Sequence, residues 1–369
     1  MLKQDVVRVV GLMSGTSLDG IDAAEIVTDG HRVLEFGPVA YRPYTDAERA
    51  LLKGAMGRWQ DDDVAEVATM VEDLHAEVAA EFADADLVGF HGQTLAHDPG
   101  GRGTHQAGDG AELARALGKP VVWDFRSADV MMGGQGAPLA PFYHFALAQH
   151  LARHLGADAP LAMLNLGGVG NLTWIDPAAS APEMDGALLA FDTGPANAPI
   201  NDLVSTRTGA AFDAQGALAA SGTVDQDMVE RFMHHAYFYK VPPKSLDRDA
   251  FADLLTDVAD LTLQDACATL TAAAATAISQ AVTFCPTPPS HILVAGGGRL
   301  NPTMMSMIAQ QVPMTVSAIE DVGFDGDQLE AQAFAYLAAR VLKGLPTSAP
   351  GTTGVAAAIG GGTVSGPAS

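Results

Sequence analysis

The chain has 369 residues and a formal net charge of −24, from 44 Asp and Glu against 20 Lys and Arg. So few basic residues argue against nucleic acids and anionic membrane surfaces as partners, although glycine turns can hold a small phosphate ligand without net positive charge. With 48% hydrophobic residues, the chain is predicted to be globular, with about two domains. The two cysteines are too few for a disulfide framework, and Lys3, Asp5 and Arg8 interrupt any export signal, so we expect a cytoplasmic location.

The first part of the chain is predicted to alternate strands with helices. Apolar, β-branched runs predict strands at 6–16 (ending in glycine turns), 23–27, 33–41, 87–90 and 120–124. Apolar residues at helical spacing predict helices at 46–56, 63–82 and 110–117. The strand at 87–90 is expected to present His91 at its end.

The same pattern then starts again. Strands are predicted at 160–166, 172–175, 188–191 and 292–294, and helices up to 150 and at 224–232, 261–284 and 329–342. The order of strand, glycine turn and strand at 11–26 recurs at 165–175, which predicts two similarly built α/β domains facing each other across a cleft. The stretch 266–298 has no charged residue, but its Thr, Ser and Gln content favours a buried helix over a membrane span.

The segment GLMSGTSLDGID at 11–22 is the first candidate for chemistry. Its glycines permit positive φ and close backbone approach, and its hydroxyl groups add donors, so this hairpin can wrap a polyphosphate. It lacks the Lys of a Walker A loop. Asp19 and Asp22 suit Mg²⁺, held directly or through water, and an ordinary Gly/Ser/Asp hairpin is an equally good interpretation of the spacing.

Two further glycine turns follow predicted strands, NLGGVGN at 165–171 and GGG at 296–298. One such turn is weak evidence, but three turns that each follow an apolar strand favour a nucleotide site, because ligands collect at strand ends in α/β sheets.

Asp192 in FDTGPAN is placed as a general base would be, after an apolar strand and before a turn, although a turn-capping Asp is the commoner role. His91, Asp124, Arg126 and Glu330 are weaker candidates. Arg126 suits either a partner such as Asp124 or a substrate carboxylate, and Glu330 lies on the helical face of Phe334. No metalloprotease, zinc, hydrolase-elbow or dinucleotide motif is present.

A set of motifs in this order resembles the anhydro-N-acetylmuramic acid kinase family. They are GLMSGTSLDGID (11–22), FHGQT (90–94), AGDG (107–110), DFRSADVMMGGQGAPLAP (124–141), LNLGGVGNLT (164–173), FDTGPAN (191–197), PPKS (242–245), GGGRLNP (296–302) and GFDGDQLEAQAFAYLAAR (323–340).

The resemblance implies an actin-like α/β fold of two RNase H-like domains, each with a five-stranded mixed sheet flanked by helices, and an active site in the interdomain cleft. We place the domains at 1–140, with the tail 345–369 able to pack back on it, and at 141–344. The implied reaction converts 1,6-anhydro-N-acetylmuramic acid, ATP and water to N-acetylmuramic acid 6-phosphate and ADP, in cell-wall recycling. ATP with Mg²⁺ is the implied cofactor set, and a homodimer is the implied assembly.

The resemblance also assigns roles to residues. Asp192 is implied to be the base that activates the attacking water. The ATP contacts are implied at Gly15, Thr16, Ser17, Leu18, Asp19, Gly20, Ile21, Asp22, Gly167, Gly168, Gly296, Gly297, Gly298 and Asn301. Candidate sugar contacts are His91, Asp124, Arg126, Thr193, Gly194 and Glu330.

Ala196 stands where the family usually has glycine, and it would add strain if that position required positive φ. Three alternatives stay open at this point: a kinase for another sugar, a nucleotide-gated binding protein without turnover, and a glycosidase-like hydrolase that needs no ATP.

Overall fold

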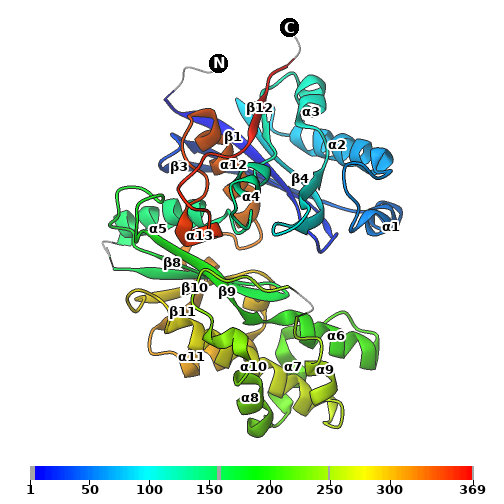
Figure 1. Cartoon of the computed structure of the whole chain (residues 1–369), viewed down its shortest axis with the longest axis vertical. Coiled ribbons are helices and arrows are strands. Elements are labelled where there is room, and N and C mark those ends of the chain that lie inside the picture. The colour runs from blue at the N-terminus through cyan, green and yellow to red at the C-terminus, as the bar shows by residue number, and fades with distance from the viewer. Residues whose placement is uncertain (1–4, 156–158, 248–249, 368–369) are drawn as a thin grey trace. The chain divides into compact units, whose positions relative to one another are not determined.

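The structure is a computed structural model that describes residues 5–155, 159–247 and 250–367 (Figure 1). The chain forms two compact units, each taken here by itself. Unit 1 comprises Met1–Ala157, Ala179–Asp185 and Asp327–Ser369, and unit 2 comprises Asp158–Ala178 and Gly186–Gly326.

Unit 1 is built on a seven-stranded mixed sheet in the order β12-β6-β4-β1-β2-β3, with β5 paired to β4. The first three strands are antiparallel neighbours, whereas β4 runs parallel to β1 and β6 parallel to β4. The strands are β1 (Val7–Ser14), β2 (Gly20–Thr28), β3 (Val33–Pro43), β4 (Leu87–Asp98), β5 (Gly103–Ala107), β6 (Val121–Trp123) and β12 (Thr363–Ser365). The helices are α1 (Asp46–Ala55), α2 (Ala65–Ala79), α3 (Gly110–Leu117), α4 (Ser127–Met131), α5 (Pro141–Leu155), α12 (Leu329–Leu342) and α13 (Pro350–Thr353).

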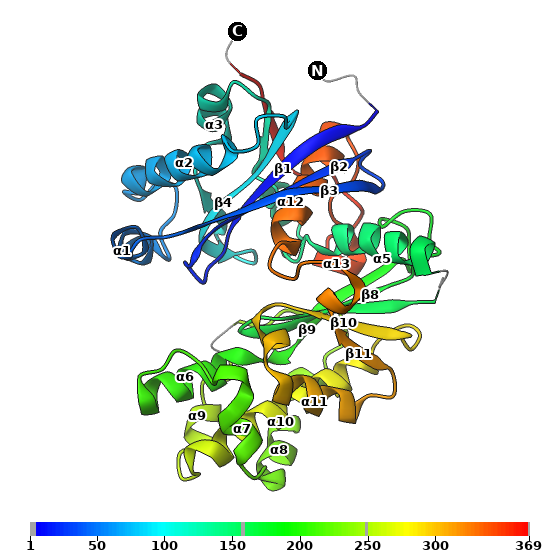
Figure 2. The same ribbon diagram turned by 180° about the vertical axis from the view of Figure 1, so that it is seen from behind.

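Alternate residues of the unit 1 strands serve the two faces of its sheet. Val10 and Phe90 belong to the apolar core that the sheet forms with α2 and α3. Their neighbours Gly11 and Gly89 lie under α12 instead, where an added Cβ would collide with backbone atoms of Ala331 and Phe334. Because successive strand residues point to opposite faces, α12 covers the face opposite α2 (Figures 1 and 2).

Unit 2 repeats the same topology in a five-stranded sheet, in the order β11-β10-β7-β8-β9. Again three antiparallel strands are followed by two parallel ones. The strands are β7 (Leu161–Leu166), β8 (Val169–Ile175), β9 (Leu188–Pro195), β10 (His291–Ala295) and β11 (Thr315–Ala318). The helices are α6 (Asn197–Thr208), α7 (Ala217–Ser221), α8 (Gln226–Met233), α9 (Leu254–Asp257), α10 (Leu263–Val282) and α11 (Pro302–Gln311), with short 3₁₀ turns η1 (Ala214–Gly216), η2 (Ala236–Tyr239), η3 (Gly297–Leu300) and η4 (Ile319–Val322).

The repeated topology confirms the predicted α/β fold of two mixed sheets flanked by helices, and it explains the duplication seen in the sequence. The sheet of unit 1 is larger than the five strands expected, because β5 and β12 are added to it. The uncharged stretch around 266–282 is α10, most of which is buried in the core of unit 2. Among the helices of the described residues, none combines the length and the hydropathy that crossing a bilayer requires.

The boundaries of the two units differ from the domain boundaries expected after residues 140 and 344. Both α5 and α12 belong to unit 1, because α12 packs on β1, β2 and β4 and also contacts α5. The tail does lie in unit 1, where β12 pairs with β6. Periodicity predicted α12 residue for residue, but it carried no information about which sheet the helix covers.

Candidate active site

The hairpin between β1 and β2 carries the first candidate site. The backbone of Leu18 has φ of 56°, and its N–H donates to the Gly15 carbonyl oxygen at 3.2 Å. Gly20 has no room for a side chain, because a Cβ would lie 2.5 Å from the Arg42 carbonyl oxygen of β3. Of the two uses that glycine permits, Gly11 and Gly20 provide close backbone approach, and the positive φ of this turn is found at Leu18. A left-handed leucine is strained, and such strain persists only where surrounding contacts impose it.

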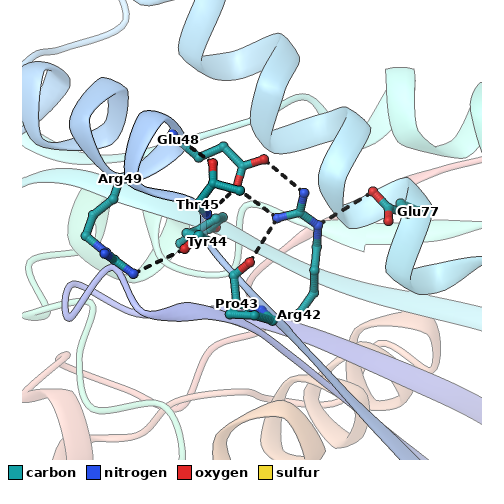
Figure 3. Close-up of polar contacts among 7 residues, drawn as sticks. All are labelled: Arg42, Pro43, Tyr44, Thr45, Glu48, Arg49 and Glu77. Atoms are coloured by element: carbon teal, nitrogen blue, oxygen red, sulfur yellow. Dashed lines mark hydrogen bonds and ion pairs between the residues drawn. The ribbon is translucent and has the colours of Figure 1, made fainter.

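Those contacts come from the junction of β3 and α1, shown in Figure 3. The guanidinium of Arg49 donates from Nε to the Leu18 carbonyl oxygen at 3.0 Å and from Nη2 to the Tyr44 carbonyl oxygen at 3.1 Å. The Tyr44 N–H in turn donates to the Asp19 carbonyl oxygen at 2.9 Å. Arg49 thus ties the tip of the hairpin to the first turn of α1.

The start of α1 is itself fixed by charge. Thr45 caps the N-terminus of the helix. Both terminal nitrogens of Arg42 donate to the Glu48 carboxylate, each at 2.9 Å from one of its oxygens (Figure 3). Glu77 on α2 lies 3.5 Å from the Arg42 Nε. The hydrogen bonds from Arg42 lower the pKa of Glu48 to about 2, so this bidentate pair is formed at neutral pH.

Asp19 and Asp22 converge near Tyr41. The Tyr41 hydroxyl donates to the Asp19 carbonyl oxygen at 3.1 Å, and burial together with the charges of Asp19 and Asp22 raises the pKa of Tyr41. The Asp19 side chain is exposed and accepts from the Ser17 hydroxyl at 2.7 Å. The described residues contain no group of three or more acidic, His or Cys side chains that could enclose a metal ion. Two carboxylates on a glycine-rich hairpin nevertheless suit Mg²⁺, which keeps most of its waters in protein sites.

His91 and Arg126 form one unit of hydrogen bonds. His91 Nδ1 donates to the Gly92 carbonyl oxygen at 2.7 Å, so its Nε2 is the acceptor for Arg126 Nε at 3.0 Å. Burial, then the charge of Arg126, lowers the pKa of His91 far below its ordinary value, which keeps the ring neutral and able to accept. Arg126 Nη1 donates to the Gly136 carbonyl oxygen at 2.7 Å. Its Nη2 has no hydrogen-bond partner among the described residues, so this end of the guanidinium is available to an anion.

Asp124 and Glu330 lie close to this pair in the fold. Asp124 follows β6 with φ of 54° and accepts from the Ser127 hydroxyl at 2.5 Å, and the described residues show no ion pair between it and Arg126. Glu330 lies in the first turn of α12, where desolvation by surrounding protein atoms raises its pKa and the charge of Arg126 opposes the shift. Since β1, β4 and β6 are parallel, the hairpin, His91 and Asp124 all lie toward the carboxyl edge of one sheet, where ligands are commonly bound.

Asp192 in unit 2 is a carboxylate held on both oxygens. It lies within β9 rather than after it, opposite Asn171 of β8. Oδ1 accepts from Asn171 Nδ2 at 2.8 Å, and Oδ2 accepts from the Leu246 N–H at 2.7 Å. Desolvation raises the pKa of Asp192, and these two hydrogen bonds oppose the shift. Each oxygen keeps a further lone pair, so the carboxylate is oriented and still able to accept a proton.

The two glycine turns of unit 2 lie side by side. Because β10 is parallel to β7 and pairs Ala295 with Asn165, both turns follow neighbouring strand ends. Gly296 has φ of 74°, and a Cβ there would lie 2.8 Å from the Leu166 carbonyl oxygen. The carbonyl oxygen of Gly168 accepts from the N–H groups of Ala196 and Ala198, at 2.9 and 3.1 Å, which joins its turn to the start of α6.

The sequence matches the family model described as anhydro-N-acetylmuramic acid kinase over residues 7–365. A relative from Cereibacter sphaeroides named "Anhydro-N-acetylmuramic acid kinase" is 62% identical over 368 residues, with 100% of this chain and 98% of the relative covered. A relative of the same name from Ruegeria sp. is 56% identical, covering 99% of this chain and 96% of the relative. The chain belongs to the anhydro-N-acetylmuramic acid kinase family. Among solved structures, a xylulose kinase from Rhodospirillum rubrum matches with 16% identity and a TM-score of 0.43, covering 98% of this chain and 94% of that one.

Within this anhydro-N-acetylmuramic acid kinase family member, several predicted contact residues have structural partners of their own. Thr193 is buried and its hydroxyl donates to the Gly170 carbonyl oxygen at 3.1 Å. Gly194 has φ of 155°, and a Cβ there would lie 3.1 Å from both Ala277 and Phe238. Asn301 caps α11 by accepting from the Met304 N–H at 3.0 Å. Ala196 has φ of −123°, so the strain considered for alanine at this position does not arise.

Several residues that support the site were not among the predicted site residues. Arg49, Asn171 and Tyr237 each contact a predicted residue through a hydrogen bond that spans many positions of the chain. Gln93 donates to the Gly15 carbonyl oxygen at 3.1 Å. Gln93 in FHGQT and Asn171 in LNLGGVGNLT belong to quoted motifs, which was the available signal for both.

Proposed function

We propose that this chain is an ATP-dependent anhydro-N-acetylmuramic acid kinase. It adds water across the 1,6-anhydro bridge of 1,6-anhydro-N-acetylmuramic acid and phosphorylates O6, giving N-acetylmuramic acid 6-phosphate and ADP. Water attacks the anomeric carbon, the bond from that carbon to O6 breaks, and O6 takes the γ-phosphoryl group of ATP. The observation that carries this proposal is full-length identity of 62% and 56% to relatives of that name.

The geometry of Asp192 supports its role as the base. A water molecule is a poor nucleophile, so the reaction requires an acceptor whose proton affinity is raised and whose position is fixed. Desolvation provides the first property, and the hydrogen bonds from Asn171 and Leu246 provide the second. Asp192 receives the proton of the attacking water in this assignment.

The glycine turns support phosphate binding by a strongly acidic protein. We assign the segment from Gly15 to Asp22 in unit 1, and the turns at 167–168 and 296–298 in unit 2, to ATP. Backbone N–H groups in such turns attract phosphate without basic side chains, which agrees with a net charge of −24. Mg²⁺ would neutralise phosphate charge, with Asp19 and Asp22 holding it directly or through water.

Arg126 supports recognition of the sugar's lactyl carboxylate. Its Nε and Nη1 are occupied by His91 and Gly136, which fixes the plane of the guanidinium and directs Nη2 away from both. Burial lowers its pKa to about 10, so it remains a cation at neutral pH. Asp124 and Glu330 are assigned to the sugar hydroxyl and amide groups.

The decisive experiment is coupled ADP release with and without the anhydro sugar. Release that depends on the sugar supports the proposal, and a panel of other sugars tests specificity. Turnover in ¹⁸O-water tests the hydrolytic step, because the anomeric hydroxyl should carry the label. Ring opening without nucleotide would instead indicate a glycosidase-like hydrolase.

Asp192→Asn tests the base. The variant should bind ATP normally and lose turnover by roughly 10²-fold or more, the usual contribution of a positioned general base. Near-normal turnover would remove Asp192 from this role. We also propose a cytoplasmic location, where ATP is available, and a homodimer, which light scattering on the purified protein would measure.

A further inference from the structure

Lys244 lies in an aromatic box inside unit 2. Its ammonium nitrogen is 4.6 Å from the ring centroids of both Tyr237 and Phe284 and 5.9 Å from that of Phe191. It also donates to the Tyr237 carbonyl oxygen at 3.2 Å. Lys244 is part of the segment between η2 and α9.

The backbone around Lys244 makes two of the hydrogen bonds to Asp192. The Asp192 N–H donates to the Lys244 carbonyl oxygen at 3.0 Å, and the Leu246 N–H, two residues further on, donates to Asp192 Oδ2 at 2.7 Å. Tyr237, which the ammonium contacts twice, donates from its hydroxyl to the Asp192 carbonyl oxygen at 2.7 Å. Lys244 therefore connects Tyr237, which binds the Asp192 backbone carbonyl, with the segment whose Leu246 N–H binds one oxygen of the carboxylate.

A lysine is a costly choice for this place if packing is its only task. Desolvation among the rings, together with the charge of Lys240, lowers the pKa of Lys244, so this half-buried environment disfavours the charged form of the side chain. An unbranched apolar residue such as methionine would fill the same space without that penalty. Residues that break a local packing preference in this way are concentrated at functional sites.

We propose that Lys244 is a positioning residue for Asp192: its ammonium, bound to the Tyr237 carbonyl and three aromatic rings, holds the Lys244–Leu246 backbone against the carboxylate. This inference rests on the proposed function, because it assumes that Asp192 is the base. Lys244 itself touches no reacting atom in this role. The positive charge of Lys244 is attracted to the faces of the rings, which keeps the side chain in place. The backbone of residues 244–246 is thereby kept in position to make its hydrogen bonds with Asp192.

The acid limb of the pH profile reports on this anchoring. A base must be deprotonated, so kcat falls as the pH drops through the pKa of Asp192. The hydrogen bond from the Leu246 N–H favours the charged form of the Asp192 carboxylate. Loss of this bond would raise the pKa of Asp192 and move the acid limb to higher pH. The titratable groups in contact with Asp192 are Tyr237, through its hydroxyl, and Lys244, through its backbone.

The test compares three lysine variants of the full chain. Lys244→Met keeps the aliphatic stem and removes the charge, Lys244→Arg keeps a cation that stacks on rings, and Lys240→Met is the matched control. Lys240 is exposed, and its ammonium lies 5.9 Å from the centroid of the Tyr237 ring. ADP release is measured against pH at saturating sugar and ATP, and thermal unfolding shows that each variant is folded.

We expect Lys244→Met to lose roughly tenfold to a hundredfold in kcat, as misplacement of a catalytic group does, with KM for ATP unchanged and the acid limb shifted upward by about one pH unit. Lys244→Arg should recover much of the rate, and Lys240→Met should match the parent chain. If Lys244→Met does not fold, Lys244→Gln is compared in its place. If the acid limb of the kcat–pH profile stays in place in Lys244→Met or Lys244→Gln, the inference is overturned, whether or not kcat itself falls.

The outcomes separate this inference from the proposed function. Absence of sugar-dependent ADP release in the parent chain would refute the kinase assignment itself. Full activity in Asp192→Asn would refute the base. A third outcome would refute the role of Lys244 alone. In that case the parent chain is active, Asp192→Asn is inactive, and the pH profile of Lys244→Met equals that of Lys240→Met.

Discussion

Replacement of Arg49 by methionine should weaken ATP binding without abolishing turnover. Methionine keeps the stem of the side chain but removes the donors to the Leu18 and Tyr44 carbonyl oxygens, at 3.0 and 3.1 Å. Leu18 would then be held in its left-handed conformation, which costs about 1 kcal/mol, by fewer contacts. The hairpin from Gly15 to Asp22 should become less well ordered before ATP binds.

The magnitude follows from the two lost hydrogen bonds. Bonds from a charged donor contribute about 1.5–3 kcal/mol each when buried, but the Arg49 side chain is 37% exposed, so about 1–2 kcal/mol is a reasonable total. The third bond, to the fully exposed Asp46, contributes little. At about 1.4 kcal/mol per factor of ten, the Kd for ATP should rise roughly 5- to 30-fold.

Titration calorimetry with ATP and Mg²⁺ measures this change, and kcat at saturating ATP should stay within about a factor of three, since the reacting groups are untouched. Arg42→Met is the matched control, because its guanidinium binds Pro43, Glu48 and Glu77 rather than the hairpin. It should lower thermal stability and leave ATP affinity unchanged. Unaltered ATP affinity in Arg49→Met, or an equal loss in both variants, would refute the reasoning.

Three further predictions address the sugar site, acid stability and packing. Arg126→Met should raise KM for the anhydro sugar at least about tenfold while KM for ATP is unchanged, and an unchanged sugar KM would remove Arg126 from the lactyl contact. Glu48→Gln should lower the free energy of unfolding by about 1–2 kcal/mol at pH 7. Because the folded pKa of Glu48 is about 2 against 4.5 ordinarily, that difference should shrink as the pH falls from 4.5 toward 2, as urea unfolding at several pH values would show. Gly11→Ala should cost about 3 kcal/mol or more through collision with Ala331 of α12, whereas Gly54→Ala, in an open position on α1, should be neutral or slightly stabilising in the same unfolding assay.

Local patterns were sufficient for most elements of this fold. The predicted helix at 329–342 coincides with α12, and the one at 110–117 with α3. Strand ends were less accurate, because β4 and β9 continue through His91 and Asp192, which sequence patterns had placed just beyond them. Pairing with β5 and β8 extends these strands, and such partners lie outside any local window.

The residues that support the site were also beyond the reach of local sequence patterns. Asp192 and Arg126 belong to motifs, so the sequence pointed to them directly. Arg49 contacts Leu18 across 31 positions of the chain, and Leu246 contacts Asp192 across 54. No periodicity or spacing in the sequence predicts either contact, because hydrogen bonds between distant segments form only once the strands are paired in their native register.

The sequence by itself determined the class of this protein. Its apolar periodicity specified alternating strands and helices, its glycine turns indicated phosphate, its low content of basic residues argued against nucleic acid, and its motifs identified the family. Tertiary structure alone decided that α12 covers the sheet of unit 1, that Leu18 rather than a glycine takes the left-handed conformation, and that Asp192 is held by backbone beside Lys244. The reason is physical: secondary structure follows from neighbours along the chain, whereas the orientation and pKa of a functional side chain follow from neighbours in space.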